Sequence, residues 1–153
     1  MTATELQAGL TRVYTTSWAA FYLYYVAIAI CWFGPHLNPE FSQRIFLSPG
    51  LGLVLGLLLL AGVIYLKYGQ HYEMSAEGVK KVWRYPARQE LLRWSEIDRI
   101  VVRAGLTQTI LRIGNVVIQP HPGQGQEMVW YGLESPKLVK MFLERGLDES
   151  TAE

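Results

Sequence analysis

The sequence predicts a membrane-anchored α+β protein, in which a two-helix transmembrane hairpin precedes a small β-rich domain capped by a C-terminal helix. Half of the 153 residues are hydrophobic and only 18% are charged, against about 25% in an ordinary soluble domain. Two runs, residues 13–39 and 45–66, contain no Asp, Glu, Lys or Arg. Beyond residue 68, short β-branched and aromatic segments alternate with turn signals. This pattern excludes a wholly soluble protein, a disordered chain and a multidomain enzyme.

The first apolar run, residues 14–34, is long enough to cross a hydrocarbon core of about 30 Å as a helix. Aromatic rings stand near both ends, at Tyr14 and Trp18 and again at Trp32, where the membrane interface favours them. We expect Gly34 and Pro35 to end the helix. A cleaved signal peptide is the alternative, but the run is too long and too bulky for one.

The second apolar run, residues 48–68, begins with a helix start signal. Ser48 is placed to cap the first turn, and Pro49 follows where its missing N–H has no consequence. The residues that follow are apolar on all sides, which is typical of a membrane span. A short linker, residues 35–47, makes the two spans an antiparallel hairpin. Lys and Arg are more frequent on the terminal side, so we expect both termini in the cytoplasm, with the hairpin in the cytoplasmic membrane.

The rest of the chain predicts seven strands and one helix. The strands are expected over residues 70–75, 79–85, 88–93, 97–103, 107–113, 115–119 and 126–131. Ser135 and Pro136 start an amphipathic helix that Gly146 is expected to stop. The predicted organisation is therefore an N-terminal segment, a hairpin, a β-rich domain and an acidic tail, over residues 1–12, 13–68, 69–147 and 148–153.

Three stretches of this region resemble bacterial pleckstrin-homology-like (PH-like) domains of the membrane-flanked type. They read WSEIDRI over residues 94–100, GLTQTILRIGNVVI over 105–118 and GLESP over 132–136. The resemblance covers residues 68–146, and two spans before such a domain are usual in that family. It implies a seven-stranded split barrel capped by a helix, used mainly for interaction, with no catalytic residue set. A similar domain occurs in proteins that help assemble photosynthetic reaction-centre complexes, which makes an energy-transducing complex, photosynthetic or respiratory, the suggested host.

Candidate catalytic and metal-binding residues are few. His36, His71 and His121 are too far apart in sequence to form a metal-binding pair, and one cysteine, Cys31, excludes an internal disulfide. The Gly-x-Gly within residues 120–126 precedes a predicted strand, whereas a phosphate cradle needs a helix N-terminus. A net charge of +1 gives no indication of nucleic-acid binding. We therefore expect no enzyme activity, no metal, no cofactor and no nucleic-acid partner.

Membrane lipid is one candidate partner of the β-rich domain. Five basic residues fall on the strands nearest the hairpin and are candidate contacts for anionic lipid: Lys80, Lys81, Arg84, Arg88 and Arg93. The region 67–103 has eight basic and five acidic residues, so a solvated, partly paired surface is the alternative. An anionic-lipid-binding or envelope-stress membrane sensor is the corresponding functional alternative.

Other membrane-protein subunits are the favoured partners. Gly52 and Gly56 are four residues apart on the second span, where small residues allow close helix packing. Tyr24 and Tyr25 lie in the middle of the first span, which the interfacial preference of aromatic residues does not explain, and they offer stacking surface to a partner protein or a pigment. The predicted function is that of a non-enzymatic accessory, assembly or scaffold subunit of a bacterial membrane complex.

Overall fold

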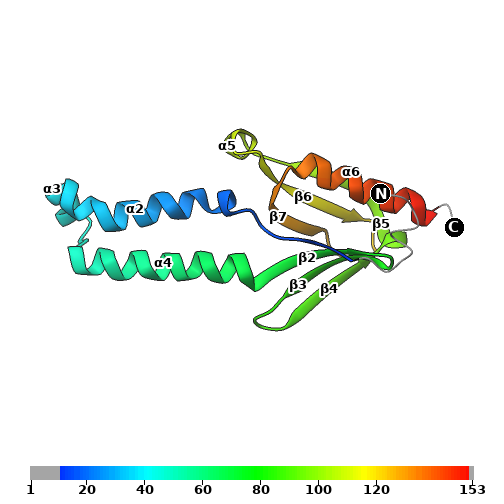
Figure 1. Ribbon diagram of the computed structural model, residues 1–153, viewed down its shortest axis with the longest axis horizontal. Coiled ribbons are helices and arrows are strands. Elements are labelled where there is room, and N and C mark those ends of the chain that lie inside the picture. Colours follow the sequence, from blue (N-terminus) through cyan, green and yellow to red (C-terminus); the bar gives the residue numbers. More distant parts are fainter. Residues whose placement is uncertain (1–10, 152–153) are drawn as a thin grey trace. The chain divides into compact units, whose positions relative to one another are not determined.

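The computed structural model describes residues 11–151 and has an α+β fold (Figure 1). The chain divides into two units. The hairpin unit is Phe21–Tyr68, and the β unit contains the residues up to Ala20 together with those from Gly69 onward. Most of the expected N-terminal segment and the end of the expected tail lie outside the described residues.

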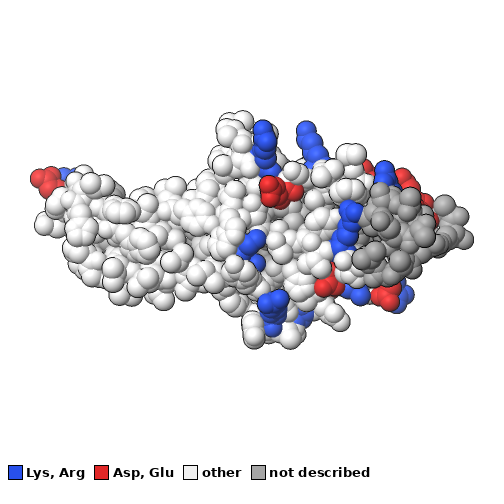
Figure 2. Space-filling view, viewed as in Figure 1, with Lys and Arg blue, Asp and Glu red and all other residues white. Residues whose placement is uncertain are grey.

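The hairpin unit consists mainly of two long apolar helices. A 3-10 turn, η1 (Trp18–Phe21), leads into α2 (Tyr22–Leu37), and a short helix, α3 (Pro39–Arg44), precedes α4 (Pro49–Gly69). The segments Trp18–Leu37 and Pro49–Gly69, of 20 and 21 residues, are both long and apolar enough to cross a membrane. Their surface is uncharged over most of its length (Figure 2). The Leu51 N–H donates to Ser48 Oγ over 3.2 Å, which confirms the predicted cap.

The first apolar helix continues past the point where we expected it to end. Pro35 lies inside α2, and the Asn38 N–H donates to the Gly34 carbonyl over 3.0 Å after the last helical residue, Leu37. Because proline has no N–H, it cannot donate to the carbonyl of Cys31 four residues earlier. The helix nevertheless continues, and Pro35 is buried.

The β unit contains two antiparallel sheets. The first has the strand order β1 (Arg12–Tyr14), β2 (Gln70–Ser75), β3 (Gly78–Trp83) and β4 (Arg88–Arg93). The second has the order β5 (Ile97–Arg103), β6 (Ile113–Pro120) and β7 (Met128–Glu134). A 3-10 turn, η2 (Trp94–Glu96), joins the sheets, and α6 (Pro136–Thr151) packs against η2, β5 and β6.

Strand β1 was not predicted from the sequence: Arg12 was assigned to the N-terminal segment, and Val13 and Tyr14 to the hairpin. Arg12, Val13 and Tyr14 pair with Met74, Glu73 and Tyr72 of β2. The whole hairpin is therefore an insertion between two hydrogen-bonded neighbouring strands. Only three residues form β1, too few for an alternating pattern to stand out beside a 27-residue uncharged run.

The predicted strand over residues 107–113 is wrong, because its first part is a short helix, α5 (Leu106–Ile110). Two β-branched threonines favoured a strand in the sequence. Local hydrogen bonds favour the helix instead: the Gly105 N–H donates to Gln108 Oε1 over 3.0 Å, and Thr109 Oγ1 donates to the Gly105 carbonyl over 3.0 Å. The seventh strand is supplied by β1.

The C-terminal helix also runs further than predicted, to Thr151. Gly146 does not stop it. A Cβ at Gly146 would lie 2.9 Å from Met74 Cε and 2.9 Å from the Trp94 ring, so glycine is needed here for close packing onto the core. Leu147 packs against the same core. The helix then continues to Thr151, so residues 148–151 of the expected acidic tail belong to it.

The two sheets share no strand pairing among the described residues, and side chains join them instead. The outer edge of β7 receives two hydrogen bonds from the first sheet: the Tyr131 N–H donates to Tyr72 Oη over 2.8 Å, and Lys81 Nζ donates to the Val129 carbonyl over 3.2 Å. The Tyr72 ring stacks on Trp130, with centroids 5.2 Å apart. Tyr72 and Trp130 are both fully buried. We call these contacts the sheet seam.

Tyr72→Phe tests the sheet seam. The variant keeps the stacked ring but leaves the Tyr131 N–H without its acceptor, and an unsatisfied buried donor costs about 1–3 kcal/mol. We expect the free energy of unfolding to fall by that amount in urea titrations that follow tryptophan fluorescence. Tyr131→Phe is the matched control, since it keeps the backbone N–H, and should change stability by less than about 0.5 kcal/mol. Equal stability of the two variants would contradict the seam.

Candidate functional site

The two glycines of α4 face the other helix of the same hairpin. Gly52 and Gly56 are both buried. A Cβ on Gly52 would overlap the Cys31 carbonyl oxygen, and a Cβ on Gly56 would overlap the Trp32 indole. Both glycines therefore pack closely against α2 of the same hairpin, where we expected the helix of another subunit. The glycine face is occupied within the chain and is not offered to another subunit.

Gly52 contacts the Cys31 carbonyl. This carbonyl lacks its usual helical hydrogen bond, because Pro35, four residues later, has no N–H. The Cys31 carbonyl oxygen lies against the Gly52 backbone, and Pro35 Cγ would be 3.5 Å from a Cβ there. A Cα–H group close to a carbonyl oxygen is a weak hydrogen-bond donor. Gly52 and Pro35 therefore form one packing unit, which sequence reasoning missed because the proline had been interpreted as a helix stop.

Tyr24 and Tyr25 remain on the outer surface of α2. Their exposed fractions are 39% and 38%. The Tyr24 ring contacts Phe21 edge-on, with centroids 6.2 Å apart. Aliphatic side chains surround the pair on the helix surface, with Leu23 and Val26 more than half exposed. Of the four residues predicted for helix packing, these two are the ones available to another subunit.

Gly56→Ile tests the packing of α2 against α4. The added side chain would collide with the Trp32 indole, and overpacking costs about 1–3 kcal/mol. We expect a lower thermal unfolding temperature for the full chain in lipid nanodiscs, followed by near-ultraviolet circular dichroism. Gly62→Ile is the matched control, because no atom lies within 4 Å of its Cβ position. Adding Trp32→Ala to Gly56→Ile should restore part of the loss. An unfolding temperature equal to that of Gly62→Ile would refute the contact.

The five basic residues predicted to contact lipid do not form one patch. Arg88 and Arg93 are the first and last residues of β4, about 17 Å apart along the strand. Lys80 pairs with Glu77 over 3.5 Å, and Arg88 pairs with Glu90 over 2.7 Å. Arg84 is exposed in the turn after β3, whereas Lys81 is buried. This arrangement matches the solvated, partly paired surface that we considered as the alternative.

Lys81 has a structural environment that the sequence did not indicate. It is 9% exposed, and its Nζ lies 4.8 Å from the Trp83 ring centroid and 4.9 Å from that of Tyr131. Burial lowers the pKa of Lys81, the Glu90 carboxylate acts in the opposite direction, and Arg88 lowers it further. Burial likewise raises the pKa of the Tyr72 hydroxyl, while its hydrogen bonds to the Tyr131 backbone and to Thr16 lower it. Both groups are engaged in the sheet seam.

The remaining titratable side chains form pairs on the surface. His71 Nε2 lies 3.0 Å from Glu73 Oε1, and His121 Nδ1 lies 3.4 Å from Asp98 Oδ1. A shallow pocket beside His121 has a volume of about 320 Å³ and is lined by Asp98, Arg99 and the β6–β7 loop. Within residues 11–151, no group of three or more His, Cys, Asp or Glu is placed to hold a metal ion.

Comparisons with protein-family models, with curated proteins and with solved structures found no match for this chain.

Proposed function

We propose that this protein is a non-enzymatic accessory or assembly subunit of a bacterial membrane protein complex. The hairpin crosses the inner membrane and binds neighbouring subunits through the outer surface of α2. The β unit is a cytoplasmic PH-like interaction domain. An energy-transducing complex is the host that the family resemblance favours.

The outward placement of Tyr24 and Tyr25 is the observation that carries this proposal. Both rings lie in the first turn of α2 and are partly exposed side by side, so they offer adjacent aromatic surface for stacking. A neighbouring subunit that packs on this turn would bury both rings. The glycine face of α4 already packs within the hairpin, which leaves this aromatic surface of α2 as the binding face.

The β unit supports an interaction role in a different way. Two of its buried polar side chains, Lys81 and Tyr72, hold the sheets together. In the part of the chain that the structure describes, the carboxylates that contact histidine belong to two separate exposed or half-buried pairs. A domain whose buried polar side chains stabilise its own fold is suited to bind a partner through its surface.

Paired substitution of Tyr24 and Tyr25 by Ala tests the proposed binding face. We expect the variant to insert and fold normally, because aliphatic neighbours maintain the hydrophobicity of α2. Co-purification of the native partners from mild detergent should fall several-fold, measured by quantitative mass spectrometry. Leu23→Ala with Val26→Ala, which removes aliphatic bulk from the same exposed turns, is the matched control. Undiminished recovery of the partners with the tyrosine variant would contradict the proposal.

A further inference from the structure

One end of the β unit carries exposed apolar side chains that its core does not use. Leu106 and Ile110 of α5 are 83% and 74% exposed, and Tyr85 in the turn between β3 and β4 is 71% exposed. Leu106 and Ile110 are four residues apart and so project from one face of the helix. We call these three residues the exit rim, because they lie at the end of the β unit where the chain passes to and from the apolar helices.

The β3–β4 turn lies where the chain enters the β unit from α4. The Arg84 N–H donates to the Gly69 carbonyl over 2.8 Å. Gly69 is the last residue of the apolar segment Pro49–Gly69. The turn that contains Tyr85 is therefore hydrogen-bonded to the last residue of a candidate membrane span.

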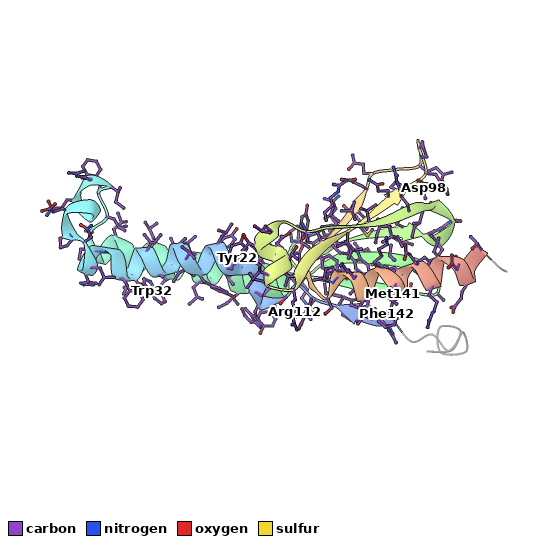
Figure 3. The ribbon with its side chains drawn as sticks, turned by 90° about the horizontal axis from the view of Figure 1, so that it is seen from above. Tyr22, Trp32, Asp98, Arg112, Met141 and Phe142 are labelled. Carbon is purple, nitrogen blue, oxygen red and sulfur yellow. The ribbon has the colours of Figure 1, made fainter. Side chains whose placement is uncertain are left out.

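Helix α5 lies at the same end of the β unit, where the chain leaves it. The Ser17 N–H donates to the Gly132 carbonyl over 2.7 Å, and Gly132 lies directly against Ala20. Strand β7 continues from Gly132 to Glu134, which pairs with Ile113 at the start of β6, about 7 Å further along the strand. Arg112, which links α5 to β6, is seen at this end of the β unit in Figure 3, and Asp98 at the opposite end.

We infer that the exit rim rests in the polar interface of the membrane, with Leu106, Ile110 and Tyr85 against the upper acyl chains. This inference depends on the proposed crossing of the membrane by the hairpin. If both apolar helices cross the bilayer, the short connections from them to the β unit hold this end of the β unit at the membrane surface. At that depth the exposed apolar side chains of the rim leave water. The hairpin already anchors the protein, so no further membrane attachment is needed to hold them there.

The charges around the exit rim fit a lipid surface. Arg84 and Arg112 are exposed beside it, and basic side chains near an anionic leaflet each contribute about 1 kcal/mol. Tyrosine is favoured at the interface, where its ring is apolar and its hydroxyl reaches water. Of the five basic residues predicted from sequence to contact lipid, Arg84 is the one that lies next to a rim residue, Tyr85, in the β3–β4 turn.

Depth-dependent fluorescence quenching tests this inference on the full chain. In a Cys31→Ala background, single cysteines are placed by Ile110→Cys, Gln124→Cys and Leu58→Cys and labelled with bimane. Gln124 lies in the β6–β7 loop at the other end of β6, about 25 Å from the rim. Leu58 is an exposed residue of α4. The proteins are reconstituted into phosphatidylcholine and phosphatidylglycerol vesicles that carry nitroxide lipids, with the nitroxide either high on the acyl chain or near its end.

We expect the shallow nitroxide to quench the label at position 110 several-fold more strongly than the label at position 124. The label at position 58 should respond most to the deep nitroxide. If position 58 is quenched and position 110 behaves like position 124, the rim inference fails while the membrane hairpin stands. If position 58 is not quenched, the hairpin is not in the membrane and both proposals fail. Shielding of position 110 from aqueous iodide without lipid quenching would show that protein covers the rim and would also overturn the inference.

Discussion

The pairing of β1 with β2 is the constraint on which the architecture depends. Tyr14 lies opposite Tyr72 in an antiparallel pair, where backbones are separated by about 5 Å. Everything between these strands, including both apolar helices, must leave and re-enter the sheet at one end. An inserted segment with its ends fixed side by side folds naturally as an antiparallel pair of helices. If the hairpin lies in a membrane, β1 and β2 are therefore on the same side of it.

The sheet seam then determines what the β unit can offer to a partner. An unpaired edge such as that of β7 is exposed to unwanted strand addition, and here side chains from β2 and β3 occupy its hydrogen-bonding groups. Tyr14 joins the arrangement from β1, with its ring centroid 5.7 Å from that of Trp130. Tyr14 is partly buried against the core, so the strand that fixes the ends of the hairpin also contributes to the core.

Sequence reasoning predicted most of this fold where the signal extends over many residues. Both apolar helices, six of the strands and the C-terminal helix follow from runs or periods that single residues do not obscure. The errors have local causes: β1 is three residues long, α5 is stabilised by side-chain hydrogen bonds of Gln108 and Thr109, and Pro35 and Gly146 pack closely where they resemble helix stops. The burial of Lys81 and the choice of α2 as the glycines' partner depend on tertiary contacts, which no local pattern encodes.

Cysteine labelling tests whether the hairpin crosses the membrane and the β unit lies in the cytoplasm. In the Cys31→Ala background, single cysteines at Asn38, between the apolar helices, and at Gln124, in the β unit, are exposed to a membrane-impermeant maleimide in right-side-out vesicles. We expect Asn38→Cys to be labelled in intact vesicles and Gln124→Cys to be labelled only after the membrane is opened. Labelling of both cysteines from the same side would show that the hairpin does not cross the membrane, and the reverse pattern would contradict the cytoplasmic placement of the β unit.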